Sequence, residues 1–367
     1  MTACRKRLFP PNHYKSKSPL LSWRWWDYLF FSFSLLAIVI ACFYWQIHAS
    51  NHSFAKETNL DLVQMLTLYQ QASQISPKQN QGITNILLLG SDQMNYRLNN
   101  SPLCDTIIIA SINWQKNQVI LLPLPRDLAL PGSELKINAL YALHSQRDPQ
   151  QALEKTAQQL AELLQIHFDY QIIVTLDAVA DFLTLIDGVQ VEVANSFTDY
   201  QFPRTDIDIN NVFDSALLYE TVSFAAGWQY LNPEMALKFI RSRHAQGIEG
   251  SDYARSRRQQ LIIKAVGDKV AQIILAELKQ YQFTFLAKLY QFYQQHFASQ
   301  LEFTESLSLL IHILAEKSMP TIINQNLLIN QLASSANLVE VNGRNFYIKI
   351  VNLSGLQAEI KQKLALP

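Results

Sequence analysis

The sequence carries little charge and no excess of either sign. Asp, Glu, Lys and Arg make up only 16% of its 367 residues, and the formal net charge at pH 7 is zero. A chain generally devoted to nucleic acid would carry a clear positive excess, so the composition argues against that class of partner. Hydrophobic residues reach 49%, which is typical of a folded protein with an apolar bias. Any cationic binding site must therefore be local.

Several motifs for metals and nucleotides are missing as well. The chain has no CxxC or HExxH sequence, which argues against a zinc site. It has no Walker A sequence or glycine-rich loop, so a nucleotide is a poor candidate for its ligand. Only three cysteines occur, and Cys104 is the only one beyond residue 48. An intrachain disulfide is therefore not expected beyond that residue.

The longest segment without charge lies near the N-terminus. From Tyr28 to Ala55 there is no Lys, Arg, Asp or Glu, and the apolar core YLFFSFSLLAIVIACFYW is long enough to cross a bilayer at about 1.5 Å per residue. Tryptophan and tyrosine flank the core on both sides, as they do at membrane interfaces. A cleaved signal peptide or a buried core helix is the alternative, but the run is long for a signal peptide. We predict a transmembrane helix over residues 27–47.

Basic residues precede this segment and set its predicted orientation. They are Arg5, Lys6, Arg7, Lys15, Lys17 and Arg24. Positive residues stay on the cytoplasmic side, which predicts a cytoplasmic tail over 1–26 and a single-pass protein of the cell membrane. A polar stalk over 48–81, a main domain over 82–270 and a mostly helical C-terminal extension over 271–367 would then lie outside the membrane.

The main domain opens with three short apolar runs. They read ITNILLLG, DTIIIASI and QVILLPL, and each ends in polar residues, which is typical of strands buried on both faces of a sheet. A helical pattern, DPQQALEKTAQQLAELLQI, and the further strand patterns YQIIVTL and GVQVEVA follow. Alternation of this kind predicts an α/β fold, a three-layer α/β/α sandwich around one central mixed sheet.

Charged residues collect at the ends of the predicted strands. Asp92 follows the first run, Asp105 opens the second, and Arg126 and Asp127 follow the third. Taken alone, each is more often a turn or capping residue. Ligands bind at strand ends in open α/β sheets, however, so a grouping at three strand boundaries favours one shared site.

Arginines are concentrated between Ile240 and Gln260. Five of the thirteen in the chain fall in this stretch: Arg241, Arg243, Arg255, Arg257 and Arg258. Asp252 is predicted to cap a helix, and a helical turn of about 100° per residue places Arg255, Arg258 and Gln259 on one face and Arg257 opposite. A solvated basic face is the alternative interpretation. The guanidinium fork suits phosphate, so arginines together with carboxylates suggest a magnesium-bound phosphate ester.

Several sequence blocks occur in the order seen in one known family. NILLLGSD, DTIIIASIN, VILLPLPRD, KINALYA, LIDGVQVEV, AAGWQYLNPEMALKFIRSRH and DYARSRRQQ resemble the LytR-CpsA-Psr family from about Asn85 to Lys269. The resemblance implies a membrane-anchored, extracytoplasmic α/β/α domain. It also implies a Mg²⁺-dependent transfer of a glycopolymer from a polyprenyl-pyrophosphate carrier onto peptidoglycan or another cell-wall acceptor.

The resemblance also implies roles for individual residues. Asp92 and Asp105 would sit at the Mg²⁺ ion and the pyrophosphate, and Asp127 would lie near the reacting centre or orient Arg126. The phosphate-binding residues would be Arg126, Arg241, Arg243, Arg255, Arg258 and Gln259. The polyprenyl tail needs a long apolar slot, for which Phe182, Ile186 and Phe239 are candidates. Ordinary core packing is the alternative for these three residues.

The chain departs from the family pattern at two places. Met94 stands where the family usually has an arginine, two residues after the first aspartate, and Leu103 replaces a second arginine before Asp105. Arg97 is the cation left nearby and takes their place in this interpretation. Two other hypotheses stay open: a hydrolase in which water replaces the wall sugar, and a non-catalytic binder of lipid-linked glycan or regulator of the envelope.

Overall fold

The computed structural model describes residues 36, 38–41, 56, 62–91, 103–204, 215–280, 284–297, 300–315, 320–325, 327, 336–341 and 345–366. The chain divides into two units, Met1–Ser50 and Asn51–Pro367. In the first unit, helical residues expose more than half of their apolar side chains; these are Leu36, Ile38, Val39 and Ile40. Among the described residues, no helix has both the length and the apolar character to cross a membrane. Most of the predicted span over 27–47 lies outside those residues.

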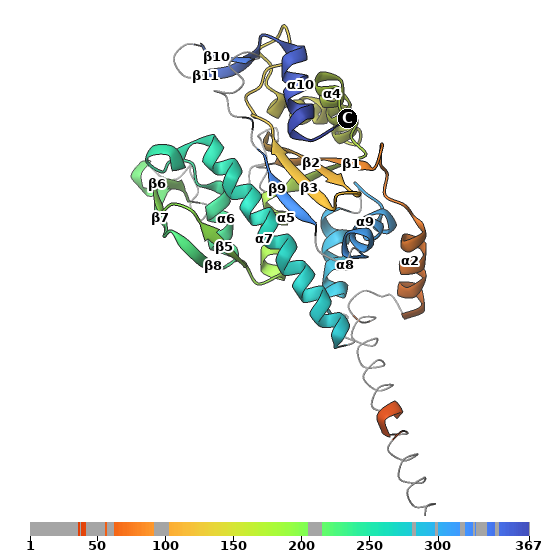
Figure 1. Ribbon diagram of the computed structural model, residues 1–367. Coiled ribbons are helices and arrows are strands. Elements are labelled where there is room, and N and C mark those ends of the chain that lie inside the picture. Colours follow the sequence, from red (N-terminus) through yellow and green to blue (C-terminus); the bar gives the residue numbers. More distant parts are fainter. Residues whose placement is uncertain are drawn as a thin grey trace, which may run out of the picture. The chain divides into compact units, whose positions relative to one another are not determined.

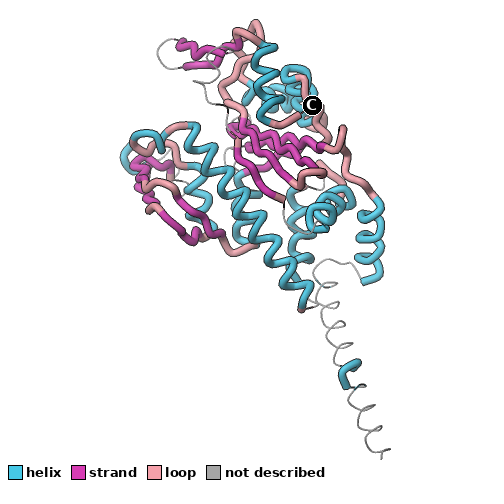
Figure 2. The backbone as a smooth tube through the Cα atoms, viewed as in Figure 1, coloured by secondary structure: helices cyan, strands magenta, loops and turns pink. Residues whose placement is uncertain are grey.

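A five-stranded mixed sheet forms the centre of the second unit (Figures 1 and 2). Its order is β4–β1–β2–β3–β9, with bounds Tyr170–Thr175, Ile83–Ser91, Cys104–Asn113, Gln118–Pro123 and Thr321–Asn324. β2 runs antiparallel to both β1 and β3, whereas the edge strands β4 and β9 run parallel to β1 and β3. The three apolar runs of the sequence therefore form strands of the central sheet, as predicted, and the structure places them next to one another.

Apolar layers cover both faces of this sheet. On one face Leu87 and Leu89 of β1 belong to the first core cluster. The helical elements of that layer are η1 (Ile137–Ala139), α3 (Leu140–Arg147), α4 (Ala152–Leu164) and α10 (Leu353–Lys363). On the other face Leu88 and Ile108 pack with Ile263 of the long helix α7 (Asp252–Lys279). Burial on both faces explains the nearly continuous apolar sequence of these strands, and the α/β fold is confirmed.

Two antiparallel ribbons lie outside the central sheet. They pair β5 (Val189–Val193) with β8 (Gly227–Leu231), and β6 (Phe197–Pro203) with β7 (Tyr219–Phe224), which follows η3 (Ser215–Leu218). With α5 (Leu176–Leu185), α6 (Pro233–Arg241) and α7 they enclose a second core cluster. The prediction that GVQVEVA belongs to one single sheet is therefore wrong. Its alternating pattern buries three valines and exposes Gln190 and Glu192, as in a ribbon with one solvated face.

The C-terminal region contributes to the main fold. It contains α8 (Thr284–His296), α9 (Phe303–Ala315), β9, β10 (Ala336–Val341), β11 (Asn345–Ile350) and α10. β9 completes the central sheet, and Ile348 and Leu356 are buried in the first core cluster. α2 (Leu62–Gln74), in the predicted stalk, packs on α9, and the Ser308 hydroxyl donates to the Ile75 carbonyl at 2.6 Å. The C-terminal region thus packs against the expected main domain, and α2 packs on that region.

Candidate functional site: a pocket with an apolar wall and three arginines

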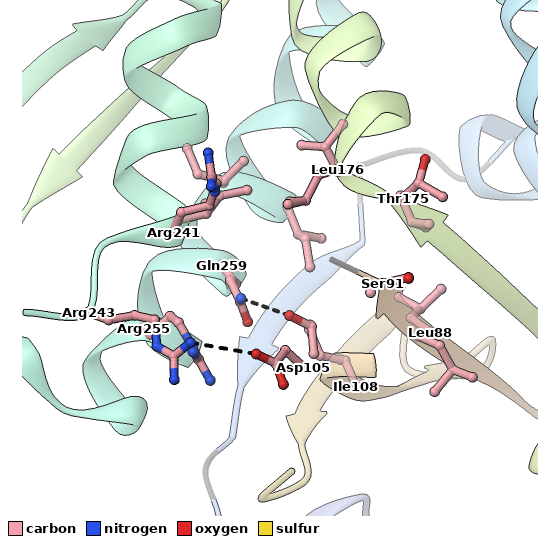
Figure 3. Close-up of a pocket in the computed structure, with 18 of the residues that line it drawn as sticks. Leu88, Ser91, Asp105, Ile108, Thr175, Leu176, Arg241, Arg243, Arg255 and Gln259 are labelled. Carbon is pink, nitrogen blue, oxygen red and sulfur yellow. Dashed lines mark hydrogen bonds and ion pairs between the residues drawn. The ribbon is translucent and has the colours of Figure 1, made fainter. Parts of the chain in front are cut away.

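A pocket of about 390 Å³ lies where the central sheet meets α5, α6 and α7 (Figure 3). Its apolar wall includes Leu88 of β1, Ile108 of β2, Leu176 of α5 and Ile262 and Ile263 of α7. Leu88 and Ile108 lie on the sheet face that α7 covers, since Leu88 points opposite to Leu87 and Leu89, which are buried on the other face. The pocket therefore uses apolar surface that the sandwich leaves incompletely filled.

Charged residues from three separate parts of the chain line the same pocket. They are Asp105 at the start of β2, Arg241 at the end of α6, Arg243 just after that helix, and Arg255 on α7. The Gln259 side chain also lines it and donates to the Thr106 hydroxyl at 2.9 Å. The described lining residues include three arginines and one carboxylate, so the pocket is positively charged. The sequence prediction that these positions share one site is consistent with this geometry.

Asp105 stands at the centre of an ionic network. Its Oδ2 atom accepts a hydrogen bond from Arg126 Nη1 at 2.6 Å and lies 3.7 Å from Arg243 Nη1. Asp127 lies behind Arg126, with its Oδ2 3.5 Å from Arg126 Nε and its Oδ1 2.7 Å from Lys136 Nζ. Asp127 is buried and is not among the lining residues. Of its two predicted roles, orientation of Arg126 fits this position.

The buried Arg255 is held in an environment that disfavours its charge. Burial lowers the pKa of its guanidinium to about 10; the Asp252 carboxylate, 2.9 Å away, opposes the shift, while Arg126 and Arg243 add to it. Burial acts on Arg126 in the same direction, but the carboxylates of Asp105 and Asp252 outweigh it and raise the Arg126 pKa. An additional anion in the pocket would relieve the repulsion around Arg255.

Arg258 does not fit the phosphate-binding role predicted for it. Its side chain is only 1% exposed, and its nitrogens donate to the carbonyls of Phe239, Ser242 and Glu249 and to the Glu249 carboxylate. It also stacks over the Phe197 ring at 4.7 Å and is absent from the pocket lining. Arg258 and Gln259 follow Arg255 by three and four positions and therefore differ by about 100° around the helix axis. This difference turns Arg258 toward α6, whereas Gln259 lines the pocket.

Two further details of α7 differ from the sequence prediction. The N-cap is Ser251, whose hydroxyl accepts from the Ala254 amide at 3.2 Å, while Asp252 is the first helical residue. Arg257 is not simply solvated, because its Nη2 lies 2.6 Å from Glu249 Oε1 and its side chain is 31% exposed. Arg257 is absent from the pocket lining, as predicted from its place on the helix. Glu249 binds both Arg257 and Arg258.

The predicted lipid-binding residues lie in the second core cluster and not in the pocket wall. Ile186 and Phe239 are buried there, and Phe182 packs against Phe292 with ring centroids 4.9 Å apart. Ordinary core packing, the alternative given above, describes their surroundings. Leu88 and Ile108 of the pocket wall were missed because they sit inside strand sequences that look uniformly buried.

Two predicted site residues cannot be placed. Asp92 and Arg97 lie outside the described residues, although Ser91, which precedes Asp92, lines the pocket. Within the described part of the chain, no group of three or more His, Cys, Asp or Glu side chains is arranged to hold a metal ion. Asp105 is the carboxylate that the described pocket offers.

Asp199 on β6 is a buried carboxylate that the sequence did not reveal. It accepts hydrogen bonds from the Ser242 hydroxyl and from the amides of Gln201, Arg243 and His244. Burial alone would raise the pKa of this carboxyl group, but these hydrogen bonds, that from Ser242 first, lower it below its ordinary value. Ser242, Arg243 and His244 lie more than forty positions from Asp199 in sequence, so no local pattern indicates these three partners.

The lowered pKa of Asp199 predicts a pH-dependent stability. We expect its contribution to be present above about pH 4, the ordinary pKa of an unfolded aspartate, and to be lost as the pH falls through the lower pKa of the folded state. Urea unfolding of the wild type and of Asp199→Asn between about pH 2 and pH 7 measures this. The difference in unfolding free energy is expected to shrink toward acid. A constant difference across the range would contradict the prediction.

Curated relatives share about half of their length with this chain. The polyisoprenyl-teichoic acid–peptidoglycan teichoic acid transferase TagU of Oceanobacillus iheyensis is 28% identical over 190 residues, covering 51% of this chain and 51% of that protein. The TagU of Halalkalibacterium halodurans is 25% identical over 174 residues, covering 46% and 47%. The similarity therefore extends over only about half of either protein.

Solved structures support the fold. The structure of TagT bound to LI-WTA has a TM-score of 0.51 and 19% identity, and the superposition covers 79% of this chain and 94% of that one. At this identity the likeness shows a shared fold and nothing finer. The LytR-CpsA-Psr family model matches residues 44–287, which is more than half of the chain, and the protein therefore belongs to the LytR-CpsA-Psr family.

Proposed function

We propose that the protein transfers a glycopolymer from a polyprenyl-pyrophosphate carrier to a sugar hydroxyl of the cell wall. The observation that carries the proposal is the pocket itself, which joins an apolar wall to a site with three arginines. A polyprenyl tail fits the apolar part, and a pyrophosphate fits the guanidinium groups. The names of the TagU relatives, which are transferases for polyisoprenyl-linked teichoic acid, point to the same class of reaction.

In the proposed reaction the acceptor hydroxyl attacks the phosphorus atom that carries the polymer. A new phosphorus–oxygen bond forms, the bond to the lipid phosphate breaks, and the lipid phosphate leaves. Arg241, Arg243 and Arg255 would stabilise the charge on the phosphate oxygens. The hydroxyl proton would pass to an aspartate. Asp127 is a poor acceptor because Lys136 and Arg126 hold its oxygens, which leaves Asp92 as the candidate.

Magnesium fits this proposal in part. Mg²⁺ is commonly held by one or two carboxylates together with phosphate oxygens, and Asp105 supplies one carboxylate in the pocket. Its Oδ2 pairs with Arg126, whereas Oδ1 has only a long contact of 3.4 Å from Asn138 Nδ2. Asp105, with Asp92 as second ligand, would hold the ion. When bound, Mg²⁺ would add positive charge beside the pyrophosphate.

The domain would be tethered to the membrane by the N-terminal segment. The exposed apolar residues at Leu36 and 38–40 support a membrane anchor over 27–47, with the main domain outside the membrane. A hydrolase would use the same pocket, with water in place of the sugar. The third hypothesis, a non-catalytic binder, is favoured by the loss of two family arginines at Met94 and Leu103, but Arg126 and Arg243 lie close to Asp105 and supply positive charge there.

A turnover assay with the full-length protein tests the proposal. The substrate is a synthetic polyprenyl-pyrophosphate-linked oligosaccharide, offered with peptidoglycan fragments and Mg²⁺, and mass spectrometry identifies the product. Asp105→Asn is expected to lower turnover by about 100-fold or more, because it removes the partner of Arg126 and a metal ligand together. Chelation of Mg²⁺ is expected to stop the wild-type reaction.

Asp268→Asn serves as the matched control. Asp268 lies on α7, pairs with Lys264 and is half-exposed, so its loss is expected to leave turnover unchanged. A phosphodiester-linked product supports the transferase, and a released sugar phosphate would instead identify a hydrolase. Binding of the lipid without either product would identify a non-catalytic protein.

A further inference from the structure

The segment between α6 and η4 (Gly247–Gly250) carries pocket residues on irregular backbone. Arg243 and His244 both line the pocket, and neither belongs to a helix or to a named strand. The Arg243 side chain is 42% exposed, and its ion pair with Asp105 is long, at 3.7 Å. Side-chain contacts alone therefore hold it weakly, and its direction depends on the backbone that bears it.

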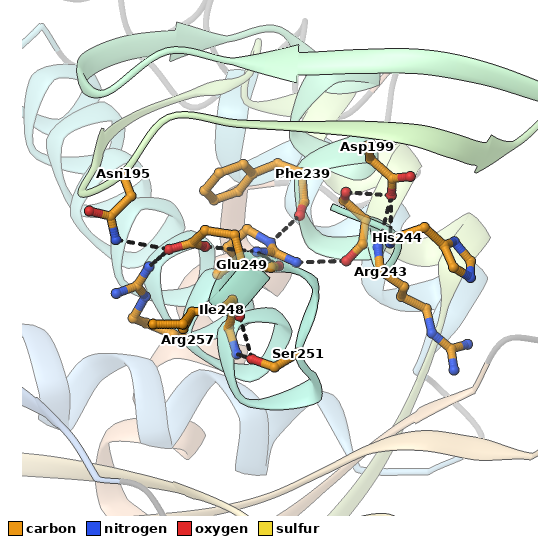
Figure 4. Close-up of polar contacts among 12 residues, drawn as sticks. Asn195, Asp199, Phe239, Arg243, His244, Ile248, Glu249, Ser251 and Arg257 are labelled. Carbon is orange, nitrogen blue, oxygen red and sulfur yellow. Dashed lines mark hydrogen bonds and ion pairs between the residues drawn. The ribbon is translucent and has the colours of Figure 1, made fainter. Parts of the chain in front are cut away.

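A buried carboxylate binds the amides of this segment. Asp199 Oδ2 accepts from the Arg243 amide at 2.9 Å, from the His244 amide at 3.1 Å and from the Ser242 hydroxyl at 2.6 Å (Figure 4). Asp199 has no exposed surface, and its Oδ1 is held by the Gln201 amide. A buried charge is costly unless it is fully hydrogen-bonded, so the carboxylate fixes the positions of its donors.

The carbonyls of the same region are held from another direction. Arg258 donates to the Ser242 carbonyl at 2.6 Å and to the Phe239 carbonyl at 3.0 Å (Figure 4). The peptide group between Ser242 and Arg243 is thus bound at its carbonyl by a buried cation and at its amide by a buried anion. Two opposite charges acting on adjacent peptide groups leave this backbone little freedom.

We infer that Asp199 is a positioning residue for the pyrophosphate site, and that it acts by fixing the backbone amides of Arg243 and His244. The inference rests on the proposed function in that it takes a pyrophosphate as the ligand of this pocket. Asp199 touches no substrate in this account. Without its carboxylate the segment would lose three hydrogen bonds at once, and the Arg243 guanidinium would no longer be directed toward Asp105.

Hydrogen exchange tests the backbone part of the inference without any ligand. In full-length Asp199→Asn, peptides covering 242–246 are expected to exchange about 10-fold faster than in the wild type, because the two amides lose a charged acceptor. Asp169→Asn is the matched control, since Asp169 is also a buried carboxylate that accepts an amide, from Asn85 at 2.8 Å, but at the opposite end of β1. Unchanged exchange over 242–246 in Asp199→Asn would overturn the inference.

Calorimetry with inorganic pyrophosphate tests whether the fixed backbone positions Arg243. Asp199→Asn is expected to weaken binding about 10-fold, and the double variant Asp199→Asn/Arg243→Ala to bind no more weakly than Arg243→Ala alone. Multiplying effects in the double variant would mean that Asp199 acts independently of Arg243, which overturns the inference. If Asp199→Asn fails to fold, Ser242→Ala removes one bond to the same oxygen, and a loss of about 3-fold with the same non-additivity is expected.

The two proposals fail in different ways. If the wild type binds no pyrophosphate, the proposed function is contradicted, and the exchange experiment still decides whether Asp199 holds the segment. If the wild type binds pyrophosphate and Asp199→Asn binds it equally well, the positioning role is wrong while the proposed function stands.

Discussion

Arg255→Ala is expected to lower the turnover of a polyprenyl-pyrophosphate substrate by about 30- to 1000-fold, which corresponds to about 2–4 kcal/mol of transition-state stabilisation. Arg255 lines the pocket and is buried, and its ion pair within the described residues is with the half-exposed Asp252, three positions before it on α7. Its contact with a doubly charged group in a partly dry site would be charge-assisted, and such contacts are the strong ones.

The same change is expected to leave the stability of the fold unchanged or slightly raised. Burial lowers the pKa of Arg255 to about 10, which means that the folded state disfavours the charged form relative to the unfolded chain. Removing the guanidinium therefore removes the free-energy cost of burying its charge. Steady-state turnover and urea unfolding, measured on the same preparation, separate the two effects.

Arg147→Ala is the control for a general loss of positive charge, because Arg147 is exposed at the end of α3. Its loss is expected to change turnover by less than about 2-fold. Equal losses at Arg147 and Arg255 would show that the arginines act as a diffuse basic surface. Turnover that falls together with stability in Arg255→Ala would contradict the ligand-binding role.

The central strands and the grouping of Asp105 with Arg126 could be predicted from the sequence because both depend on local patterns. A strand buried on both faces must be apolar almost throughout, and the three central strands are. Strand ends gather at sheet edges, which places Asp105 near Arg126 although 21 positions separate them. Arg241 ends α6, Ser242 after it has extended backbone with φ −57° and ψ 133°, and both Arg241 and Arg243 line the pocket.

The failures have a common cause in contacts that tertiary structure creates. Helical spacing groups Arg255, Arg258 and Gln259. It cannot show that Arg258 donates to three carbonyls, two from α6 and the segment after it and one from η4. The buried partners of Asp199 are equally invisible before the chain is folded. Phe239 and Ile186 were predicted as lipid contacts because they are large and apolar, a property that a core residue shares with a pocket residue.

Arg258→Ala is expected to lower the free energy of unfolding by about 3–5 kcal/mol, the largest loss of stability among these arginines. The change leaves the carbonyls of Phe239, Ser242 and Glu249 without a donor and the buried Glu249 carboxylate with Arg257 and Asn195 as its partners. It also leaves a cavity beside the rings of Phe197 and Phe239, which the guanidinium contacts in the wild type. Urea unfolding monitored by tryptophan fluorescence measures the loss.

Arg257→Ala provides the matched control on the same helix. Both arginines bind Glu249, but Arg257 is part-exposed and donates to no backbone carbonyl in the contacts described above, so its loss is expected to cost about 0–1 kcal/mol. Arg258→Lys restores the charge but not the fork that reaches several carbonyls, and it is expected to recover only part of the stability. If Arg258→Ala were as stable as the wild type and defective only in pyrophosphate binding, Arg258 would be a phosphate ligand, as the helical spacing first suggested. The buried hydrogen bonds predict the reverse, because four of the five N–H donors of Arg258 bind protein acceptors and its side chain is only 1% exposed.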